Sequence, residues 1–345
     1  MAGSRHHHVW QILQRGFGTK RGKDHHIWVY RKNQPPEQTV TRLFGMEKHF
    51  YGPEGSEADI NITKYENENQ STIQEVRLLP DGAGVDAEFA ATLIGHLEIR
   101  SAFLREEASK IFRKGISGLS KTLTSPEILR KMMRKYLKEN PEQVDKLLAE
   151  QFIPANDRDQ AKRLMEEALN HVHSETLLQS IAPGLSILEN FSELLPSLAK
   201  DAHNKVLADS ASGHSRLDLY RNFKYRVFRS EAGGFILPDT TICFAKHGGA
   251  APFSQKDDQL EAVALPLSSS VAIVGSPTGV QPFSLKTLNR LLAACSFRSF
   301  IALQNDASFR ALQGRIGKYA KLIKDRDLDI SIDELSLRSP QSSSE

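Results

Sequence analysis

The chain has 345 residues, of which 39% are hydrophobic and 25% charged, and its formal net charge is +3 at pH 7. This composition is typical of a globular protein with a substantial core, and the lack of an apolar run of about 18 residues argues against a membrane span. The N-terminus lacks the apolar core of a signal peptide, and the only cysteines are Cys243 and Cys295. We therefore expect a reducing, cytoplasmic setting without a disulfide framework.

Charge is distributed unevenly along the first hundred residues. Residues 1–50 contain nine Lys or Arg against three Asp or Glu, together with six of the twelve histidines, whereas residues 51–100 contain three against ten. The basic start could belong to a site for an anionic ligand. The two segments could also neutralise each other in the fold, and this second interpretation is favoured because the overall balance falls short of a nucleic-acid-binding stripe.

Residues 1–56 are predicted to form a histidine-rich, basic helix and a hairpin. The run from His6 to His8 is too short for a purification tag, and it directly precedes a short helix over 9–15 that ends at a glycine. Strands are predicted through 27–30 and near 39–44, because aromatic and β-branched residues are bounded there by Pro and Gly.

Residues 57–210 are predicted to be helical. Ser125-Pro126-Glu127 and Asn140-Pro141-Glu142 each combine an N-cap residue, a proline at the first helical position and an acid behind it, which is a strong start signal. Elsewhere in this zone apolar residues recur three and four positions apart. The expected helices are 57–79, 86–114, 126–138, 142–151, 157–171 and 174–208, with 126–138 and 142–151 on the surface.

Residues 220–325 are predicted to be rich in strands. The runs YRNFKYRVFRS, FILPDTTICF, LEAVALPLSSS, VAIVGSP and SFIALQ are strand-like and are separated by Gly, Pro and Asp. Two helices are expected here, one opened by Ser284 and one over 306–324. The tail over 326–345 is expected to be disordered.

These elements predict an α+β fold, in which a helical middle zone is inserted between a short N-terminal hairpin and a C-terminal, mostly antiparallel sheet with flanking helices. We favour one body over 1–325, because the strands before and after the helical zone are too few to make two independent sheets. A separate helical domain is the alternative.

Several motifs follow one another in a recognisable order: a His pair, a short helix ending in Arg-Gly-Phe, a Trp-Val-Tyr strand and the run EKHFYG. The residues concerned are His7, His8, Leu13, Arg15, Gly16, Phe17, Trp28, Val29, Tyr30, Glu47, Lys48, Phe50, Tyr51, Glu66, Arg100 and Asn289, with FILPDTT and ALPLSSSVAIVG. In this order they resemble the bacterial family known as domain of unknown function 4238, over about 5–303. The chain departs from the family at Val9-Trp10, where a residue and a proline are usual, and at 238–241, where Ser/Thr-Asp-Asn-Pro is usual. The resemblance implies no settled activity.

The resemblance draws attention to five polar residues from all three zones: His7, His8, Glu66, Arg100 and Asp239. If the fold gathers them around Asp239, with Arg100 reaching in from the helical zone, the set suits chemistry on phosphates. The predicted function is then a metal-dependent phosphodiester hydrolase, of which a nuclease is one kind, with Glu66, Arg100 and Asp239 as catalytic residues. The predicted partner is nucleic acid or another phosphate ligand.

Ligands for a divalent metal are expected from His6, His7 and His8. Successive side chains of an extended segment point to opposite faces, so the plausible arrangements are His6 with His8, or His7 alone.

The alternative function is a non-catalytic binding or regulatory protein, in which the same residues form a buried polar network. An Asp in a turn between strands most often accepts hydrogen bonds from nearby backbone. An Arg in an amphipathic helix most often pairs with a buried acid. A His beside an apolar helix is usually a satisfied core or capping residue.

Overall fold

The computed structural model describes residues 5–209, 217–255 and 258–322, which form two compact units. Residues 5–108 and 199–322 make up the first unit, and residues 109–198 make up the second. The sequence predicted a single body over 1–325 with a helical zone over 57–210, and the choice between one body and a separate helical domain stays a prediction. The helices over 57–78 and 87–99 belong to the first unit, so the inserted unit is shorter than the predicted zone.

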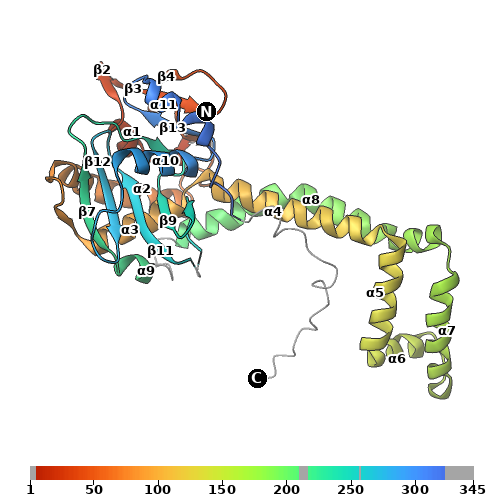
Figure 1. Ribbon diagram of the computed structural model, residues 1–345. Coiled ribbons are helices and arrows are strands. Elements are labelled where there is room, and N and C mark those ends of the chain that lie inside the picture. Colours follow the sequence, from red (N-terminus) through yellow and green to blue (C-terminus); the bar gives the residue numbers. More distant parts are fainter. Residues whose placement is uncertain (1–4, 210–216, 256–257, 323–345) are drawn as a thin grey trace. The chain divides into compact units, whose positions relative to one another are not determined.

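The α+β class is confirmed, and every strand pair of the described residues is antiparallel. The largest sheet of the first unit has six strands in the order β10-β9-β11-β12-β7-β6. Its strands are β6 (Gly84–Val85), β7 (Lys224–Arg229), β9 (Cys243–Lys246), β10 (Gly249–Ala251), β11 (Leu260–Pro266) and β12 (Val271–Ser276). Helix α10 (Leu285–Cys295) contacts β9 and β10 and lies across the sheet in Figure 1. All six residues of β12 are buried, because the core lies on both of its faces.

A second sheet joins the two ends of the first unit in the order β2-β3-β13-β8, and β4 also pairs with β3. Its strands are β2 (Thr19–Arg21), β3 (Asp24–Arg31), β4 (Glu37–Val40), β8 (Leu237–Pro238) and β13 (Ser299–Ala302). The predicted hairpin is therefore present as β3 and β4, although its second strand ends at Val40 and residues 41–45 form a turn.

His6 and His7 lie in a separate two-stranded sheet, and His8 follows it. Strand β1 (Arg5–His7) pairs with β5 (Met46–Lys48), and the short helix α1 (Gln11–Arg15) follows. Helix α1 begins two residues later than predicted, because Trp10 has φ −57° and ψ 127° and serves as its N-cap. Helix α1 ends at Arg15 with Gly16 as its C-cap, as the sequence predicted.

The single helix predicted over 86–114 is wrong. The structure has α3 (Ala87–Ile99) and α4 (Ala102–Leu123), interrupted at Arg100 and Ser101. The Ser101 hydroxyl accepts a hydrogen bond from the backbone N–H of Phe103 at 3.2 Å, so Ser101 opens a new helix. The interruption places Arg100 at the end of α3, where its side chain is buried.

The other helix of the first unit that bears on the site is α2 (Glu57–Leu78), which was predicted over 57–79. The Ser56 hydroxyl caps its N-terminus by accepting from the Asp59 N–H at 3.4 Å. The short helix α9 (Leu217–Arg221) precedes β7 and contacts α3.

The second unit is helical and contains α5 (Pro126–Glu139), α6 (Pro141–Glu150), the 3-10 turn η1 (Ala155–Asp157) and α7 (Arg158–His171). It also contains the later part of α4 and the earlier part of α8 (Ser174–Asp209). The predicted Ser125 cap is present, because its hydroxyl accepts from the Ile128 N–H, whereas Asn140 makes no side-chain cap. Leu129, Val144 and Leu169 are buried where α5, α6 and α7 meet.

The helix predicted over 306–324 is also wrong within the described residues. Only α11 (Ala307–Arg310) and the 3-10 turn η3 (Gln313–Arg315) form. Gly317 has φ +81°, and its N–H donates to the Ser296 carbonyl, while the Tyr319 N–H donates to Ala294. The chain therefore follows the end of α10 instead of continuing as a helix. Residues 323–324 and the predicted disordered tail over 326–345 lie outside the described residues.

Within the described part of the chain, no helix combines the length and the apolar character that a membrane span requires.

Candidate functional site

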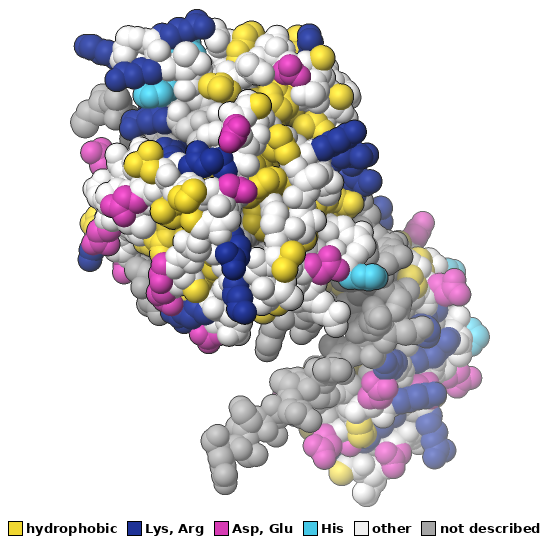
Figure 2. Space-filling view, turned by 60° about the vertical axis from the view of Figure 1, so that its left-hand side comes forward, with side chains coloured by type: hydrophobic (Ala, Val, Ile, Leu, Met, Phe, Trp, Pro, Cys, Tyr) yellow, Lys and Arg dark blue, Asp and Glu magenta, His cyan; other side chains and the backbone are white. Residues whose placement is uncertain are grey.

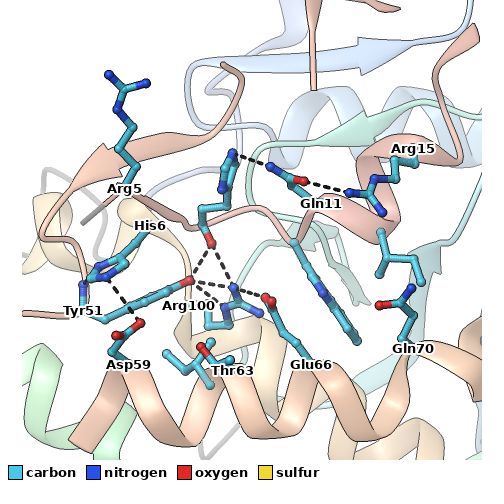
Figure 3. Close-up of a pocket in the computed structure, with 14 residues that line it drawn as sticks. Arg5, His6, Gln11, Arg15, Tyr51, Asp59, Thr63, Glu66, Gln70 and Arg100 are labelled. Atoms are coloured by element: carbon cyan, nitrogen blue, oxygen red, sulfur yellow. Dashed lines mark hydrogen bonds and ion pairs between the residues drawn. The ribbon is translucent and has the colours of Figure 1, made fainter. Parts of the chain in front are cut away.

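A polar cavity of about 250 Å³ lies in the first unit beside the N-terminal histidines, and we call it the histidine cavity (Figure 3). Strand β1, helix α1, helix α2 and the end of α3 all contribute to it. The residues from α2 recur three or four positions apart and therefore share one helix face. The full lining is Arg5, His6, His7, Trp10, Gln11, Ile12, Arg15, Tyr51, Asp59, Ile62, Thr63, Glu66, Gln70 and Arg100.

The floor of the histidine cavity is built around Arg100, whose side chain is only 1% exposed. Its guanidinium pairs with the Glu66 carboxylate at 2.6 Å and donates to the His7 carbonyl at 2.9 Å. It also donates to the Tyr51 hydroxyl from Nε and Nη2, and from Nη1 to the His96 ring at 3.2 Å. In Figure 3 dashed lines from Tyr51 and Glu66 meet at this guanidinium. The positive charge is therefore compensated on several sides.

At neutral pH Arg100 is charged and Tyr51 is uncharged. Burial of Arg100 opposes its charge, but the Tyr51 and Glu66 oxygens outweigh burial and raise the pKa of the guanidinium above its ordinary value. Burial raises the pKa of the Tyr51 hydroxyl to about 12, although the Arg100 charge opposes this shift. Tyr51 therefore keeps its proton at neutral pH and donates it to the His7 carbonyl at 2.6 Å.

His6 is buried against Tyr51, with ring centroids 4.9 Å apart. Its Nδ1 accepts a hydrogen bond from the Tyr51 N–H at 2.9 Å, so we assign the ring hydrogen to Nε2, which faces the Asp59 carboxylate at 3.4 Å. Burial lowers the pKa of His6 even though Asp59 opposes this effect. His6 thus serves as a neutral bridge between the Tyr51 backbone and helix α2.

The His7 ring has both a donor and an acceptor close to the same nitrogen. The Gln11 amide nitrogen lies 3.1 Å from His7 Nε2, and the Arg42 carbonyl oxygen lies 3.2 Å from it. Arg15 donates to the Gln11 carbonyl oxygen and so turns the Gln11 amide toward the ring. Burial lowers the pKa of His7, so the ring is neutral at pH 7 and can carry its hydrogen on either nitrogen.

Two further arginines, Arg5 and Arg15, are among the lining residues and are exposed, and in Figure 3 the Arg5 side chain points away from the Arg100 network. Neither has a carboxylate partner among the described residues. Because the histidines are neutral, the lining residues include three arginines against two acids, Asp59 and Glu66. The cavity therefore carries a positive excess.

Asp239 lies outside the histidine cavity and binds the backbone of the segment before β13. Its carboxylate accepts from the backbone N–H groups of Phe297, Arg298 and Ser299 at 2.7, 2.8 and 2.9 Å. Burial raises the pKa of this carboxyl to about 6, and the three N–H groups oppose the shift. Two residues on, Thr241 has φ +64°, a strained conformation for a β-branched residue that the clamped turn maintains.

The predicted gathering of the candidate residues around Asp239 is not what the structure has. Arg100, Glu66, His6 and His7 line the histidine cavity, whereas His8 and Asp239 line a second cavity that shares no lining residue with it. His8 follows the end of β1 and lies on the other cavity from His6 and His7, and Asp239 is held by the segment before β13.

Among the described residues, no group of three or more His, Cys, Asp or Glu side chains is placed to hold a metal ion. His6 and Asp59 face each other, but His6 also engages the Tyr51 N–H, and Glu66 is paired with Arg100. Metal ligation by His6, His7 and His8 stays a prediction.

The interpretation from sequence missed Asp59 and Gln11 and gave Tyr51 no role. Asp59 and Glu66 are seven residues apart on α2, two helical turns on one face. That spacing could have predicted that Asp59 and Glu66 face the same cavity. The contacts of Tyr51 with Arg100 and His7 link distant parts of the chain and had no local signal.

No family model, curated protein or solved structure matches this chain. The resemblance to domain of unknown function 4238 therefore stays a prediction.

Proposed function

We propose that the chain binds a small phosphate-bearing ligand in the histidine cavity, with Arg5 and Arg15 as the groups that contact the phosphate. The observation that carries this proposal is the pair of exposed arginines, Arg5 and Arg15, which have no carboxylate partner among the described residues and belong to a lining with more arginines than acids. A guanidinium matches phosphate oxygens with two parallel hydrogen bonds.

The buried Arg100 has a supporting role in this proposal. Its donors already contact Glu66, Tyr51, His96 and the His7 carbonyl, so it shapes the cavity floor and contributes long-range positive potential. In this proposal Arg100 has the role of a residue in a buried polar network, which was the alternative to a catalytic role.

A small ligand is favoured over a long duplex. On the face shown in Figure 2, Lys and Arg side chains occur in several groups with Asp and Glu between them. An extended nucleic-acid interface would need a continuous basic stripe.

The test is calorimetric titration of the full chain with inorganic phosphate and with a nucleoside monophosphate. We expect binding that weakens as ionic strength rises, because exposed charges are screened by salt. Arg15→Gln should weaken binding by about tenfold, which corresponds to one charge-assisted contact. Arg21→Gln is the matched control, since Arg21 is exposed on β2 and lines neither cavity. Equal affinity of the two variants contradicts the proposal.

A second candidate function, hydrolysis of a phosphodiester in the same cavity, is favoured by the His7 ring. Neutral at pH 7, with Gln11 and the Arg42 carbonyl beside one nitrogen, this ring can take up a proton and release it from either side. The proposed base is therefore His7, without a metal.

Hydrolysis of bis-p-nitrophenyl phosphate in the presence of a chelator tests this candidate. We expect activity in the parent chain and its loss in His7→Gln, with His25→Gln as the control because His25 lines neither cavity. Activity that requires added metal, or that survives His7→Gln, contradicts the metal-free mechanism.

A further inference from the structure

A row of exposed apolar side chains follows one face of α8 in the second unit, and we call it the α8 stripe. Its four members are large, and each is 44–68% exposed: Ile187, Phe191, Leu194 and Leu198. Spacings of four, three and four residues place all of them on one side of the helix. Single apolar residues on a surface are normal, whereas a contiguous row of this kind usually marks a surface that a partner covers.

Helix α4 runs beside α8 in the opposite direction. It leads from the first unit into the second, and α8 leads back. Near the boundary Arg105 of α4 donates to His203 and Asn204 of α8, and Figure 1 shows the two helices together beyond this point. Both helices rise about 1.5 Å per residue. Counted from this contact, residues 110–121 of α4 therefore lie level with the α8 stripe.

The part of α4 that accompanies the stripe is basic. Residues 109–123 contain four bases and no acid. All four bases are exposed, and they are Lys110, Arg113, Lys114 and Lys121. Arg113 and Lys121 form no ion pair with any described residue. An apolar stripe next to a row of bases suits an occupant that is both apolar and acidic.

The chain itself contains such a segment. Beyond the last described residue the sequence continues for 23 residues, 323–345. Within them the run LDISIDELSL, residues 328–337, has five apolar residues, three acids and no base. Leu328, Ile332 and Leu335 recur four and three residues apart, which is the spacing of the α8 stripe. The segment therefore matches the stripe in pattern and the adjoining part of α4 in charge.

We propose that residues 328–337 dock on the α8 stripe as a short amphipathic helix, with Leu328, Ile332 and Leu335 against the stripe. Ten residues are too few for a stable helix in water, so the helix forms only where it packs. Docking removes apolar side chains of both helices from water, and the acids of the segment are attracted by the bases of α4. This contact does not depend on phosphate binding in the histidine cavity.

The experiment is hydrogen–deuterium exchange of the full chain, read by mass spectrometry on peptides from its C-terminus. A synthetic peptide of residues 328–337 supplies the unprotected rate. We expect the backbone N–H groups of 328–337 in the chain to exchange about tenfold more slowly than those of the peptide or beyond, because docking holds them in hydrogen bonds. Residues 341–345 should exchange without protection.

Variants on both sides of the contact locate the docking surface. Phe191→Ser and Leu194→Ser in the stripe should each remove the protection of 328–337, and so should Ile332→Ser in the segment. The matched control in the segment is Leu337→Ser, because Leu337 lies on the opposite face of such a helix from Leu328.

A control for the stripe is Leu164→Ser, at a residue of α7 that is exposed to a similar degree. Lys121→Glu should weaken the protection, as should high salt, because both reduce the attraction between the bases and the acids. Thermal unfolding establishes that each variant is folded, and Ile332→Ser keeps the test decisive if a stripe variant unfolds.

The proposal is overturned if residues 328–337 exchange at the rate of the free peptide. It is equally overturned if their protection survives both stripe variants, since the segment would then be bound elsewhere. Light scattering identifies the main rival occupant. A dimer that dissociates in Phe191→Ser, together with an unprotected segment, would mean that a second copy of the chain covers the stripe instead.

Discussion

The Tyr51 hydroxyl lies between the Arg100 guanidinium and the His7 carbonyl. It accepts from Arg100 Nε at 2.9 Å and from Nη2 at 2.6 Å, and it donates to His7 at 2.6 Å. The end of α3 and the strand that carries the histidines are thereby joined through one oxygen atom. The shape of the histidine cavity depends on this junction.

Replacement of Arg100 should destabilise the first unit strongly. Arg100→Met leaves the Glu66 carboxylate, the Tyr51 hydroxyl and the His7 carbonyl without their donor. Breaking one side of a buried ion pair costs about 3–5 kcal/mol, so we expect a loss of this order in the free energy of unfolding. Urea denaturation measures it. Arg21→Met, at an exposed position on β2, should change the midpoint little.

A prediction on pH concerns His203, which is buried on α8 within the first unit. Its Nδ1 accepts from Arg105 Nε at 3.2 Å, and its Nε2 lies 2.6 Å from the Ile99 carbonyl. Burial lowers the pKa of His203 from its usual 6.5 to about 4, and the Arg105 charge adds to the shift.

The unfolded chain takes up a proton at this histidine once the pH falls below about 6.5, whereas the folded chain does so only near pH 4. As the pH falls from about 6.5 to about 4, His203 therefore lowers the free energy of unfolding by up to about 1.4 kcal/mol per pH unit. His203→Gln, which keeps an acceptor and a donor, should flatten the pH dependence of unfolding in this window by one proton. His247→Gln, at a largely exposed site, should not. Parallel curves for parent and His203→Gln contradict the assignment.

Gly16 should tolerate no side chain. A Cβ built at this position would lie 2.4 Å from the Leu267 carbonyl oxygen and 2.9 Å from the Ser268 Cα. Both are backbone atoms that cannot move aside cheaply. We expect Gly16→Ala to lower the free energy of unfolding by about 1–3 kcal/mol through overpacking. Gly84→Ala is the control, because nothing lies within 4 Å of its Cβ position.

The two cysteines should be inert toward thiol reagents in the folded protein. Cys295 donates to Cys243 at 3.5 Å, and both side chains are buried. Burial raises the pKa of Cys295 well above its ordinary value, and the reactive species is the thiolate. Time courses with a colorimetric disulfide reagent should show no reaction in native buffer and two reactive thiols in guanidinium chloride. Rapid reaction of either thiol in the native state contradicts this prediction.

Local signals in the sequence were sufficient for the fold class. Ser125 and Ser284 cap the helices that they were expected to start, and the strand-like runs of the last zone pair antiparallel. The interruption at Arg100 had no such signal, because the apolar residues on either side keep helical spacing. The helix ends there since Arg100 turns to Tyr51, a partner distant in the sequence.

The prediction of a helix over 306–324 was wrong for a related reason. Phe309, Ile316 and Ala320 are buried at spacings that also suit a helix. The left-handed Gly317 and the hydrogen bonds to the end of α10 override this pattern. Local propensity is a weak preference when tertiary hydrogen bonds compete with it.

The candidate site was only partly predictable. Glu66 and Arg100 do meet, but as a buried pair in the floor of a cavity. Asp239 was interpreted as a catalytic group, although a turn residue that accepts from nearby backbone was the alternative, and its three N–H contacts are of that kind. A catalytic role for Glu66, Arg100 or Asp239 stays a prediction.

The pairing of β3 with β13 has a consequence for the order in which the chain can fold during synthesis. Residues 24–31 leave the ribosome early, whereas their partners at 299–302 emerge last among the described strands. At roughly 5–20 residues per second the delay is on the order of tens of seconds. For that time the nascent β3, with Ile27 and Val29 destined for the core, presents an apolar strand without its central neighbour. Production of the protein in cells should therefore respond to the supply of chaperones that shield nascent strands.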